Sequence, residues 1–306
     1  MEIAKIKTLS KTFIISLLCF CFVVSCHLFD KETELKKSVR KQVEEVFSKL
    51  EKISYSDIEQ FLYENKNVDE YGIKWLVENY DNRVKKDWFG KNNINYHTDY
   101  LYKIISEIGN IKEGDTVVDL GSGFGLDCIL LKQIIVGEKG KVTGVDIDES
   151  SNIVARKYSD HLGYSNVDFI LGDARELQFD DNVADVVISN FTLTLISEKE
   201  KVFSEIFRIL KEGGNCYIGD AILYGDNFEL LKKMKIDTLY ADWYVRRSIS
   251  EAEYVKMLER IGFKNIKIEI TDFTMIDAEG RLLGVPNTRK YRDKIISASI
   301  YIFAEK

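Results

Sequence analysis

The sequence predicts an α/β protein with a doubly wound, mostly parallel sheet and a helical extension in front of it. Two observations predict this fold class. Between residues 116 and 218, apolar runs typical of buried strands alternate with amphipathic segments typical of helices. Nearer the C-terminus, two further strand-like runs flank a long excursion, which indicates an antiparallel hairpin at the edge of the sheet. The 306 residues suit one domain with an extension, divided here into residues 1–29, 30–95 and 96–306.

Residues 1–29 are expected to be a leader that is separate from the fold. Three lysines, Lys5, Lys7 and Lys11, precede an uncharged run from Thr12 to Cys26, which has the layout of a secretory signal and is short for a membrane span. Val23-Val24-Ser25-Cys26 resembles a bacterial lipoprotein box, in which cleavage leaves Cys26 to be lipidated. An uncleaved anchor is the alternative, and both predict membrane association through residues 12–26.

The extension is expected to be helical. Apolar residues recur at helical spacing from Glu32 to Ile53, namely Leu35, Val39, Val43, Val46, Phe47, Leu50 and Ile53. Ser56 and Glu59 form a capping-box pattern for a short helix through Tyr63. The aromatic-rich segment from Trp75 to Tyr102 follows and ends in a helix from Thr98 to Ile108. Its Tyr80, Trp88, Tyr96 and His97 are candidates for a ligand lid, with core packing as the alternative.

The α/β part is organised around Val117–Gly125, which reads Val-Val-Asp-Leu-Gly-Ser-Gly-Phe-Gly. A buried strand ends in an acid, and three alternate glycines precede an apolar-periodic segment, so the strand turns sharply into a helix. Glycine allows the backbone to approach a ligand closely, and the free N–H groups of the helix start attract electron-rich atoms. The pattern therefore predicts a site for a nucleotide-like ligand.

The remaining elements follow in regular order. Strands are expected at residues 116–120, 141–146, 167–171, 184–189 and 215–218, and the late pair at 265–270 and 296–303. Helices are expected at residues 126–136, 150–162, 199–210 and 250–261, the last opened by Ser250 and closed by Gly262, with a further helical stretch at 227–240.

Four candidate ligand-binding sites fall at the carboxyl ends of successive strands, where a doubly wound sheet binds ligands. They are Asp119 with Gly121, Ser122 and Gly123; Asp146 followed by Ile147; Asp173 with Ala174; and Ser189 with Asn190. Asp146 is placed to accept hydrogen bonds from two ribose hydroxyls, and Asp173 from an adenine amine. Asn190 opens a loop that faces the reacting end of a bound cofactor.

Several other ligand classes are excluded or disfavoured. Leu126 occupies the place of the third glycine in a dinucleotide fingerprint, and the Gly-Lys-Ser/Thr of a P-loop is absent. A formal charge of −7 argues against a nucleic-acid partner. Of five cysteines, three lie in the leader, and Cys128 and Cys216 have neither metal-ligand spacing nor a disulfide partner. No metal site is therefore expected.

At these motifs the sequence resembles the class I S-adenosylmethionine-dependent methyltransferases. Its Gly-Ser-Gly-x-Gly-x-Asp-Cys, Gly-Tyr-Ser-Asn-Val, Val-Ile-Ser-Asn, Glu-Lys-Glu-Lys-Val and Gly-Phe-Lys-Asn are most similar to the arsenite methyltransferase branch, with the ubiquinone/menaquinone methyltransferases as neighbours. The resemblance implies a Rossmann-like, seven-stranded sheet whose last strand is antiparallel. It also implies that Asp119, Gly121, Ser122 and Gly123 hold the methionine part of the cofactor, Asp146 the ribose, and Asp173 with Ala174 the adenine.

The sequence departs from the arsenite branch at the substrate. Arsenite enzymes capture As(III) with cysteine thiolates, a soft-ligand requirement. At the corresponding places this chain has Phe191 and the segment Ala241-Asp242-Trp243-Tyr244. Cys128 matches a family position next to the cofactor loop but cannot form a thiolate cluster by itself. The cofactor half of the family pattern is intact and the arsenic half is missing.

The expected function is transfer of a methyl group from S-adenosylmethionine to an unidentified small or amphiphilic acceptor. The protein mainly has to align the acceptor and exclude water. Candidates for an optional general base are Tyr96, His97, Asp242 and Tyr244. The alternatives are a catalytically inactive binding or scaffold protein, an arsenite methyltransferase proper and an NAD-dependent oxidoreductase. The oligomeric state stays open.

Location is open as well. Export as a lipoprotein would separate an enzyme from S-adenosylmethionine, which is made and kept in the cytosol. For an uncleaved anchor, more basic residues follow the apolar run than precede it, the following ones being Lys31, Lys36, Lys37, Arg40 and Lys41. The positive-inside rule then favours a cytosolic domain.

Overall fold

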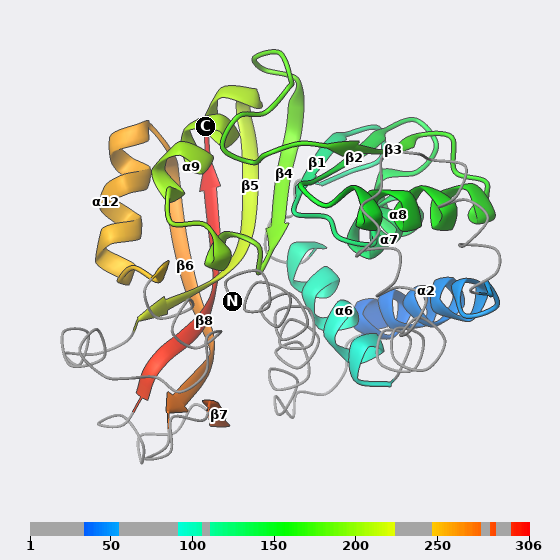
Figure 1. The fold of residues 1–306 in the computed structure, drawn as a ribbon, viewed down its shortest axis with the longest axis horizontal. Helices are drawn as coiled ribbons and strands as arrows, with labels where there is room; N and C mark the ends of the chain where they lie inside the picture. The colour runs from blue at the N-terminus through cyan, green and yellow to red at the C-terminus, as the bar shows by residue number, and fades with distance from the viewer. Residues whose placement is uncertain (1–33, 55–90, 106–110, 224–246, 277–281, 286–294) are drawn as a thin grey trace, which may run out of the picture.

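A single mixed sheet forms the centre of the protein. The computed structural model describes residues 34–54, 91–105, 111–223, 247–276, 282–285 and 295–306. Within these residues the sheet has eight strands in the order β3-β2-β1-β4-β5-β8-β6-β7 (Figure 1). The parallel strands are β1 (Thr116–Leu120), β2 (Lys141–Asp146), β3 (Val167–Leu171), β4 (Ala184–Asn190) and β5 (Leu210–Leu223). The predicted doubly wound parallel sheet is confirmed.

The antiparallel part of the sheet is also confirmed, with two additions. Strand β8 (Ile295–Glu305) lies between β5 and β6 (Lys264–Ile276) and is antiparallel to both. The later strand of the predicted hairpin is therefore an interior strand, and its Ile300 and Ile302 are fully buried. A short strand, β7 (Leu282–Val285), pairs with the end of β6 and extends the seven expected strands to eight.

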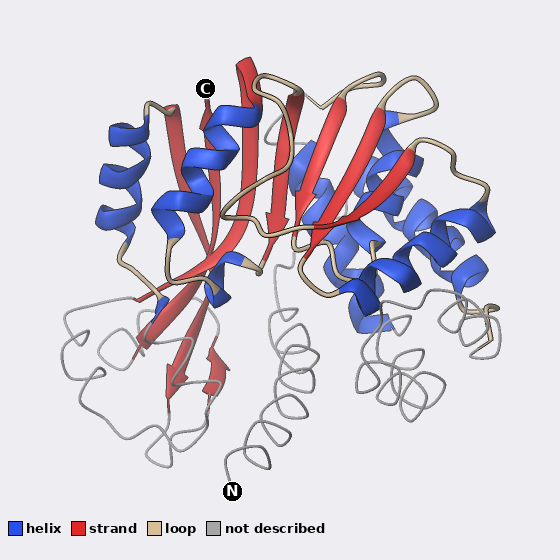
Figure 2. Ribbon diagram, turned by 45° about the horizontal axis from the view of Figure 1, so that its top comes forward, coloured by secondary structure: helices blue, strands red, loops and turns tan. Residues whose placement is uncertain are grey.

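Helices cover both faces of the sheet (Figure 2). On one face lie α2 (Glu34–Leu50), α6 (Lys91–Lys103), α7 (Leu126–Leu131) and α8 (Glu149–Leu162). On the other face lie α9 (Lys199–Ile209) and α12 (Glu251–Ile261), preceded by a single 3₁₀ turn, η4 (Leu193–Leu195). The predicted helix 126–136 is α7 continued by a π-helical segment, η3 (Lys132–Val136).

Capping residues set the helix ends where the sequence indicates them. Ser250 and Glu253 form a complete capping box at the start of α12, and Gly262 ends the helix with φ 119°. Asp148 caps α8 by accepting from the backbone N–H groups of Ser150 and Ser151, both at 3.1 Å. The ends of these two helices therefore follow from local residues.

The N-terminal extension packs on the domain. Five predicted apolar positions of α2, from Val39 to Leu50, are buried in the same hydrophobic cluster as residues of α7 and α8. Leu35 was expected on this face but is 44% exposed, because it lies in the first turn of α2. Helix α6 begins at Lys91 rather than at Thr98. The buried Thr98 donates from Oγ1 to the carbonyl of Ile94 at 2.6 Å and so lies inside the helix.

Several predicted features lie outside the described residues. These are the leader, the short helix at 56–63, the lid candidates Tyr80 and Trp88, and the helical stretch at 227–240. Helix α6 spans the boundary expected between residues 95 and 96, and the division into domains stays a prediction. In the part of the chain that the structure describes, no helix combines the length and apolar character needed to cross a bilayer.

The packing of α2 predicts a contrast between two of its leucines. Leu50 is fully buried and Leu35 is 44% exposed. Leu50→Ala should lower the free energy of unfolding by about 2–5 kcal/mol, because it leaves a cavity in the core. Leu35→Ala should change it by less than about 0.5 kcal/mol. Urea unfolding of both variants measures the difference, and equal effects would mean that α2 does not share the domain core.

Candidate functional site

The candidate site lies at the switch point of the sheet. From β1 the chain enters α7 on one face, and from the neighbouring strand β4 it reaches α9 on the other face. The elements that follow β1 and β4 therefore lie on opposite faces, and the carboxyl ends of such a pair of strands are where open α/β sheets bind ligands in a crevice.

The glycine-rich loop after β1 has the left-handed backbone that its sequence predicts. Gly121 has φ 74°, and a Cβ there would lie 2.0 Å from the side-chain oxygen of Thr192. Gly123 has φ 51°, and a Cβ there would meet no described atom within 4 Å, so its outer side is open. Between them, the Ser122 hydroxyl is buried and has no hydrogen-bond partner within the described structure. An open backbone beside an unpaired buried hydroxyl fits a bound ligand.

Asp146 faces this loop from the end of β2. Its Oδ2 accepts from the backbone N–H of Gly123 at 2.8 Å, and its Oδ1 from that of Asp148 at 2.9 Å. Burial raises the pKa of the Asp146 carboxyl, and the two backbone hydrogen bonds oppose this. The next residue, Ile147, is 71% exposed. The arrangement presents acceptor oxygens and an apolar surface side by side, as the ribose and base of a nucleoside require.

Asp119 is the most deeply buried acid of the site. It is 2% exposed, and the Cys128 thiol donates to its Oδ2 at 3.2 Å. Burial, followed by the charge of Asp127, raises the pKa of the Asp119 carboxyl well above its ordinary value, and Asp146 adds to the effect. Three carboxyl groups thus converge on the glycine-rich loop, which makes the crevice suited to a ligand with cationic groups.

Asp127 was missed by the sequence analysis. It lies in the first turn of α7, and its carboxylate joins His97 of α6 to Asn190 of β4. Its signal in the sequence is the aspartate of the motif Gly-Ser-Gly-x-Gly-x-Asp-Cys, two residues after Gly125. Of the four candidates for a general base, His97 is thus brought to the site. The side chain of Tyr96, and both Asp242 and Tyr244, lie outside the described residues.

The predicted adenine site has an additional partner. Arg175 donates to Asp173 from Nε, 3.0 Å from Oδ1, and from Nη2, 2.6 Å from Oδ2. Its Nη1 donates to Oε2 of Glu198 at 2.6 Å. The contact with Arg175 lowers the pKa of the Asp173 carboxyl. Ala174 is largely buried. A ligand amine would share the Asp173 carboxylate with Arg175, and the assigned role stays a prediction.

The loop after β4 contacts the glycine-rich loop directly. Thr192 donates from Oγ1 to the carbonyl of Gly121 at 3.2 Å. Between it and Asn190, Phe191 has φ 56° and its N–H donates to the carbonyl of Gly219 at 2.8 Å. At the start of this loop, the Ser189 hydroxyl donates to the carbonyl of Leu120 at 2.7 Å. The two sides of the crevice are therefore fixed to each other through polar contacts.

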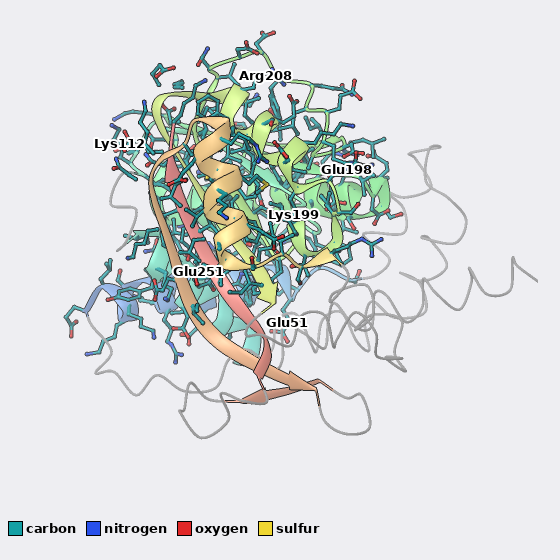
Figure 3. All side chains as sticks on the ribbon, turned by 90° about the vertical axis from the view of Figure 1, so that its left-hand side faces the viewer. Glu51, Lys112, Glu198, Lys199, Arg208 and Glu251 are labelled. Atoms are coloured by element: carbon teal, nitrogen blue, oxygen red, sulfur yellow. The ribbon has the colours of Figure 1, made fainter. Side chains whose placement is uncertain are left out.

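A buried ion pair behind this loop was also missed. Lys199, at the start of α9, lies 3.0 Å from Asp220 of β5, and both side chains are almost fully buried. Lys199 also donates to the carbonyl of Leu193 at 2.6 Å. The hydroxyls of Thr194 and Tyr254 donate to Asp220. Figure 3 looks onto α12, with Lys199 and Arg208 marking the two ends of the neighbouring helix α9. The pair connects η4, α9, β5 and α12.

The two cysteines outside the leader are buried thiols. Cys128 and Cys216 are both fully buried, and burial raises the pKa of Cys216 to about 12 and also raises that of Cys128. Their protonated form is favoured, whereas soft metal ions bind thiolates. Across the described ranges, no group of three or more His, Cys, Asp or Glu side chains is arranged to hold a metal ion.

Comparison with known proteins identifies the central region. Residues 111–262 match the family model described as "Methyltransferase domain". Arsenite methyltransferase from Mus musculus is 38% identical over 133 residues, which are 40% of this chain and 35% of that protein. The ubiquinone/menaquinone biosynthesis C-methyltransferase of Escherichia fergusonii is 34% identical over 113 residues, 37% of this chain and 45% of that protein. The chain thus spans less than half the length of either relative.

A solved structure gives the same result. An arsenic(III) S-adenosylmethionine methyltransferase from Chlamydomonas reinhardtii has a TM-score of 0.54 and 27% identity, with 64% of this chain and 65% of that chain covered. The predicted resemblance, both to this superfamily and to its arsenite and quinone branches, is confirmed.

The burial of Asp119 predicts a pH-dependent stability difference. The pKa of the Asp119 carboxyl in the folded protein lies above the ordinary 3.8. Protonation of this carboxyl therefore stabilises the folded state at low pH, and this contribution to stability is lost as pH rises through the pKa of the folded protein. Asp119→Asn removes this titration, so the stability of the variant relative to wild type should rise as pH is raised from 4 to 8. Thermal unfolding from pH 4 to pH 8 measures the gap. The exposed Asp168→Asn is the control, and a wild type that gains stability over Asp119→Asn with rising pH would contradict the raised pKa of Asp119.

Proposed function

Residues 111–262 form a methyltransferase domain, and we propose that the chain is an enzyme that transfers a methyl group from S-adenosylmethionine to a small or amphiphilic acceptor. The observation that carries the proposal is the convergence of Asp119, Asp127 and Asp146 on an open glycine-rich loop. S-adenosylmethionine carries an ammonium and a sulfonium, and both favour a crevice lined by carboxylates.

The residues of the site fit this cofactor group by group. Asp119, Gly121, Ser122 and Gly123 would hold the methionine part, where the unpaired Ser122 hydroxyl offers a donor and an acceptor. Asp146 would accept from the ribose hydroxyls beside the exposed Ile147. Asp173 and Ala174 would hold the adenine, and Asn190 would face the reacting end.

When bound, S-adenosylmethionine supplies a methyl group that its sulfonium makes electrophilic. The chain then has to orient the two reactants and keep water out, and general-base assistance is needed only if the acceptor must lose a proton. The loop from Asn190 to Thr192 supports the first task, because its contacts with Asp127 and Gly121 fix the side of the crevice next to β4. His97 is the general-base candidate whose side chain lies among the described residues of the site.

The acceptor is proposed not to be trivalent arsenic. The relative from Mus musculus named arsenite methyltransferase matches 40% of this chain. Phe191 stands where that branch has a cysteine. Cys128 is fully buried, and its thiol donates a hydrogen bond to Asp119. A protein that binds S-adenosylmethionine without turnover is the rival function, and the loss of the arsenic-binding cysteines favours it. Profiling of metabolites with labelled cofactor, looking for any labelled product, separates the two.

Cofactor identity is tested by ligand-dependent thermal shifts of the full chain. S-adenosylmethionine and its demethylated product should each raise the melting temperature, by several degrees at a hundredfold excess over the Kd. Asp146→Ala should abolish the shift because it removes the acceptor for the ribose, whereas Asp168→Ala, an exposed change on β3, should preserve it. Stabilisation by NAD, with no response to either sulfur compound, would instead indicate an oxidoreductase.

Arsenite methylation gives a second expected outcome. Purified protein supplied with S-adenosylmethionine, arsenite and a thiol reductant should form no methylated arsenic above background. The physical reason is that the two described thiols are buried and held protonated. Robust formation of methylarsenic, lost in Cys128→Ser or Cys216→Ser, would overturn the proposed exclusion of arsenic.

We further propose that the protein is membrane-associated through residues 12–26, with the catalytic domain on the cytosolic side. The support is the charge asymmetry around the apolar run and the cytosolic supply of the proposed cofactor. Fractionation should place the full-length protein with membranes, protected from external protease, in both wild type and Cys26→Ala. Wholly soluble protein would contradict the anchor, and a protease-exposed domain that depends on Cys26 would indicate export.

A further inference from the structure

Three side chains from three separate elements meet beside the glycine-rich loop. Nδ1 of His97, on α6, lies 2.8 Å from Oδ1 of Asp127, in the first turn of α7. Nδ2 of Asn190, at the end of β4, lies 2.9 Å from Oδ2 of the same carboxylate. Each oxygen of Asp127 thus has a different partner, and the carboxylate bridges α6 and the end of β4.

The chemistry of the three groups fixes the direction of both hydrogen bonds. As a carboxylate, Asp127 can only accept, so the amide N–H of Asn190 and the Nδ1–H of His97 are the donors. The side chains of His97 and Asp127 are 9% and 11% exposed. Hydrogen bonds to a charged group in such surroundings are stronger than those at the surface, and removing one donor is correspondingly costly.

The bridge spans the switch point. Asp127 belongs to the loop and helix that follow β1, and Asn190 belongs to β4, whose next residues contact Gly121 and Gly219. The orientation of the Asn190 amide therefore depends on where the Asp127 carboxylate is held. Asp127 also lies close enough to Asp119 for its charge to raise the pKa of that carboxyl, so its position affects the most buried acid of the site as well.

His97 is itself held by the extension. The ring of Phe47, on α2, meets the imidazole edge to face with 5.5 Å between centroids. Phe47 is 2% exposed, in the cluster that joins α2 to α7 and α8. Both residues lie before the region 111–262 that matches the methyltransferase domain. Helix α6, which begins in the extension, therefore contributes a side chain to a site whose other members lie within that domain.

We propose that His97 is a positioning residue of the cofactor site: through its Nδ1–H bond to Asp127 it holds Asn190 at the reacting end of the crevice and so makes cofactor binding depend on the N-terminal extension. The proposal rests on the proposed function, since it concerns the same site. It differs from a role for His97 as a general base, which would use the imidazole to take a proton from the acceptor.

Two conservative substitutions distinguish the two nitrogens of the imidazole. The amide nitrogen of asparagine can occupy the place of Nδ1, and that of glutamine reaches the place of Nε2. His97→Asn should therefore preserve the bond to Asp127, whereas His97→Gln and His97→Ala should lose it. The three variants are compared with wild type by titration calorimetry with S-adenosylhomocysteine, and circular dichroism with thermal unfolding checks that each is folded.

The expected result is a pattern of affinities. His97→Ala and His97→Gln should bind S-adenosylhomocysteine about tenfold more weakly than wild type, and His97→Asn within about threefold of wild type, a tenfold change being 1.4 kcal/mol. In the Asp127→Ala background, which removes the acceptor, His97→Ala should add little further loss, because both changes remove the same interaction. Wild-type affinity in all three His97 variants, or equal losses in His97→Asn and His97→Ala, would overturn the proposal.

A measurement on the unaltered protein keeps the test independent of variant folding. The chain has three histidines, His27, His97 and His161, so the imidazole signals of ¹³C-histidine-labelled protein can be assigned with the two variants His97→Asn and His161→Asn. S-adenosylhomocysteine should shift the His97 signal and leave that of His161 unchanged. If wild type binds the compound without any change at His97, the positioning role is wrong while the proposed function stands. If wild type binds neither S-adenosylmethionine nor its product, the proposed function itself fails.

Discussion

The burial of negative charge at the carboxyl ends of β1 and β2 is the constraint on which the site depends. Asp119, Asp127 and Asp146 approach the same glycine-rich loop, and the pKa of Asp119 rises because burial and its two acidic neighbours oppose ionisation. The surrounding structure offsets part of this cost with donors: the Cys128 thiol, the backbone of Gly123, and the side chains of Asn190 and His97. Such an arrangement is unfavourable in a merely structural core, where apolar residues of similar volume would be more stable. At a switch point, such an arrangement suits a ligand that carries positive charge.

The fold was predictable because its signals are local. Strands β1 to β4 and helices α8, α9 and α12 lie within a residue or so of their predicted bounds, since buried runs, the glycine-rich turn and caps such as Ser250 and Gly262 act over a few residues. The predicted start of α6 was wrong because threonine is a common N-cap residue, whereas Thr98 is buried inside the helix. The interior position of β8 was not evident either, because strand order in a sheet depends on contacts between segments far apart in sequence.

The candidate site was predictable in part for the same reason. Residues that end strands, such as Asp119 and Asp146, carry a positional signal. Asp127 stands in the quoted motif Gly-Ser-Gly-x-Gly-x-Asp-Cys, but its role comes from partners that are remote in the chain. The pair of Lys199 with Asp220 likewise depends on remote partners. From sequence alone, a lysine and an aspartate are expected to be solvated surface charges, and only the fold shows that Lys199 and Asp220 lie in the core. Arg175 lies two residues from Asp173, but it reaches Glu198 only when the loop after β3 and the start of α9 are brought together.

The interior position of β8 has a consequence for how the chain folds during synthesis. Strand β6 joins the sheet through β8, which is antiparallel to it and to β5, yet β8 is made after both. Until residues 295–305 leave the ribosome, β5 has an unpaired edge and β6 has no place in the sheet. Closure of this half is therefore a late, long-range step, which is slow compared with local helix formation and leaves strand edges open to wrong pairing in the meantime. The half that carries the glycine-rich loop, from β1 to β4, can by contrast assemble while the rest of the chain is still being made.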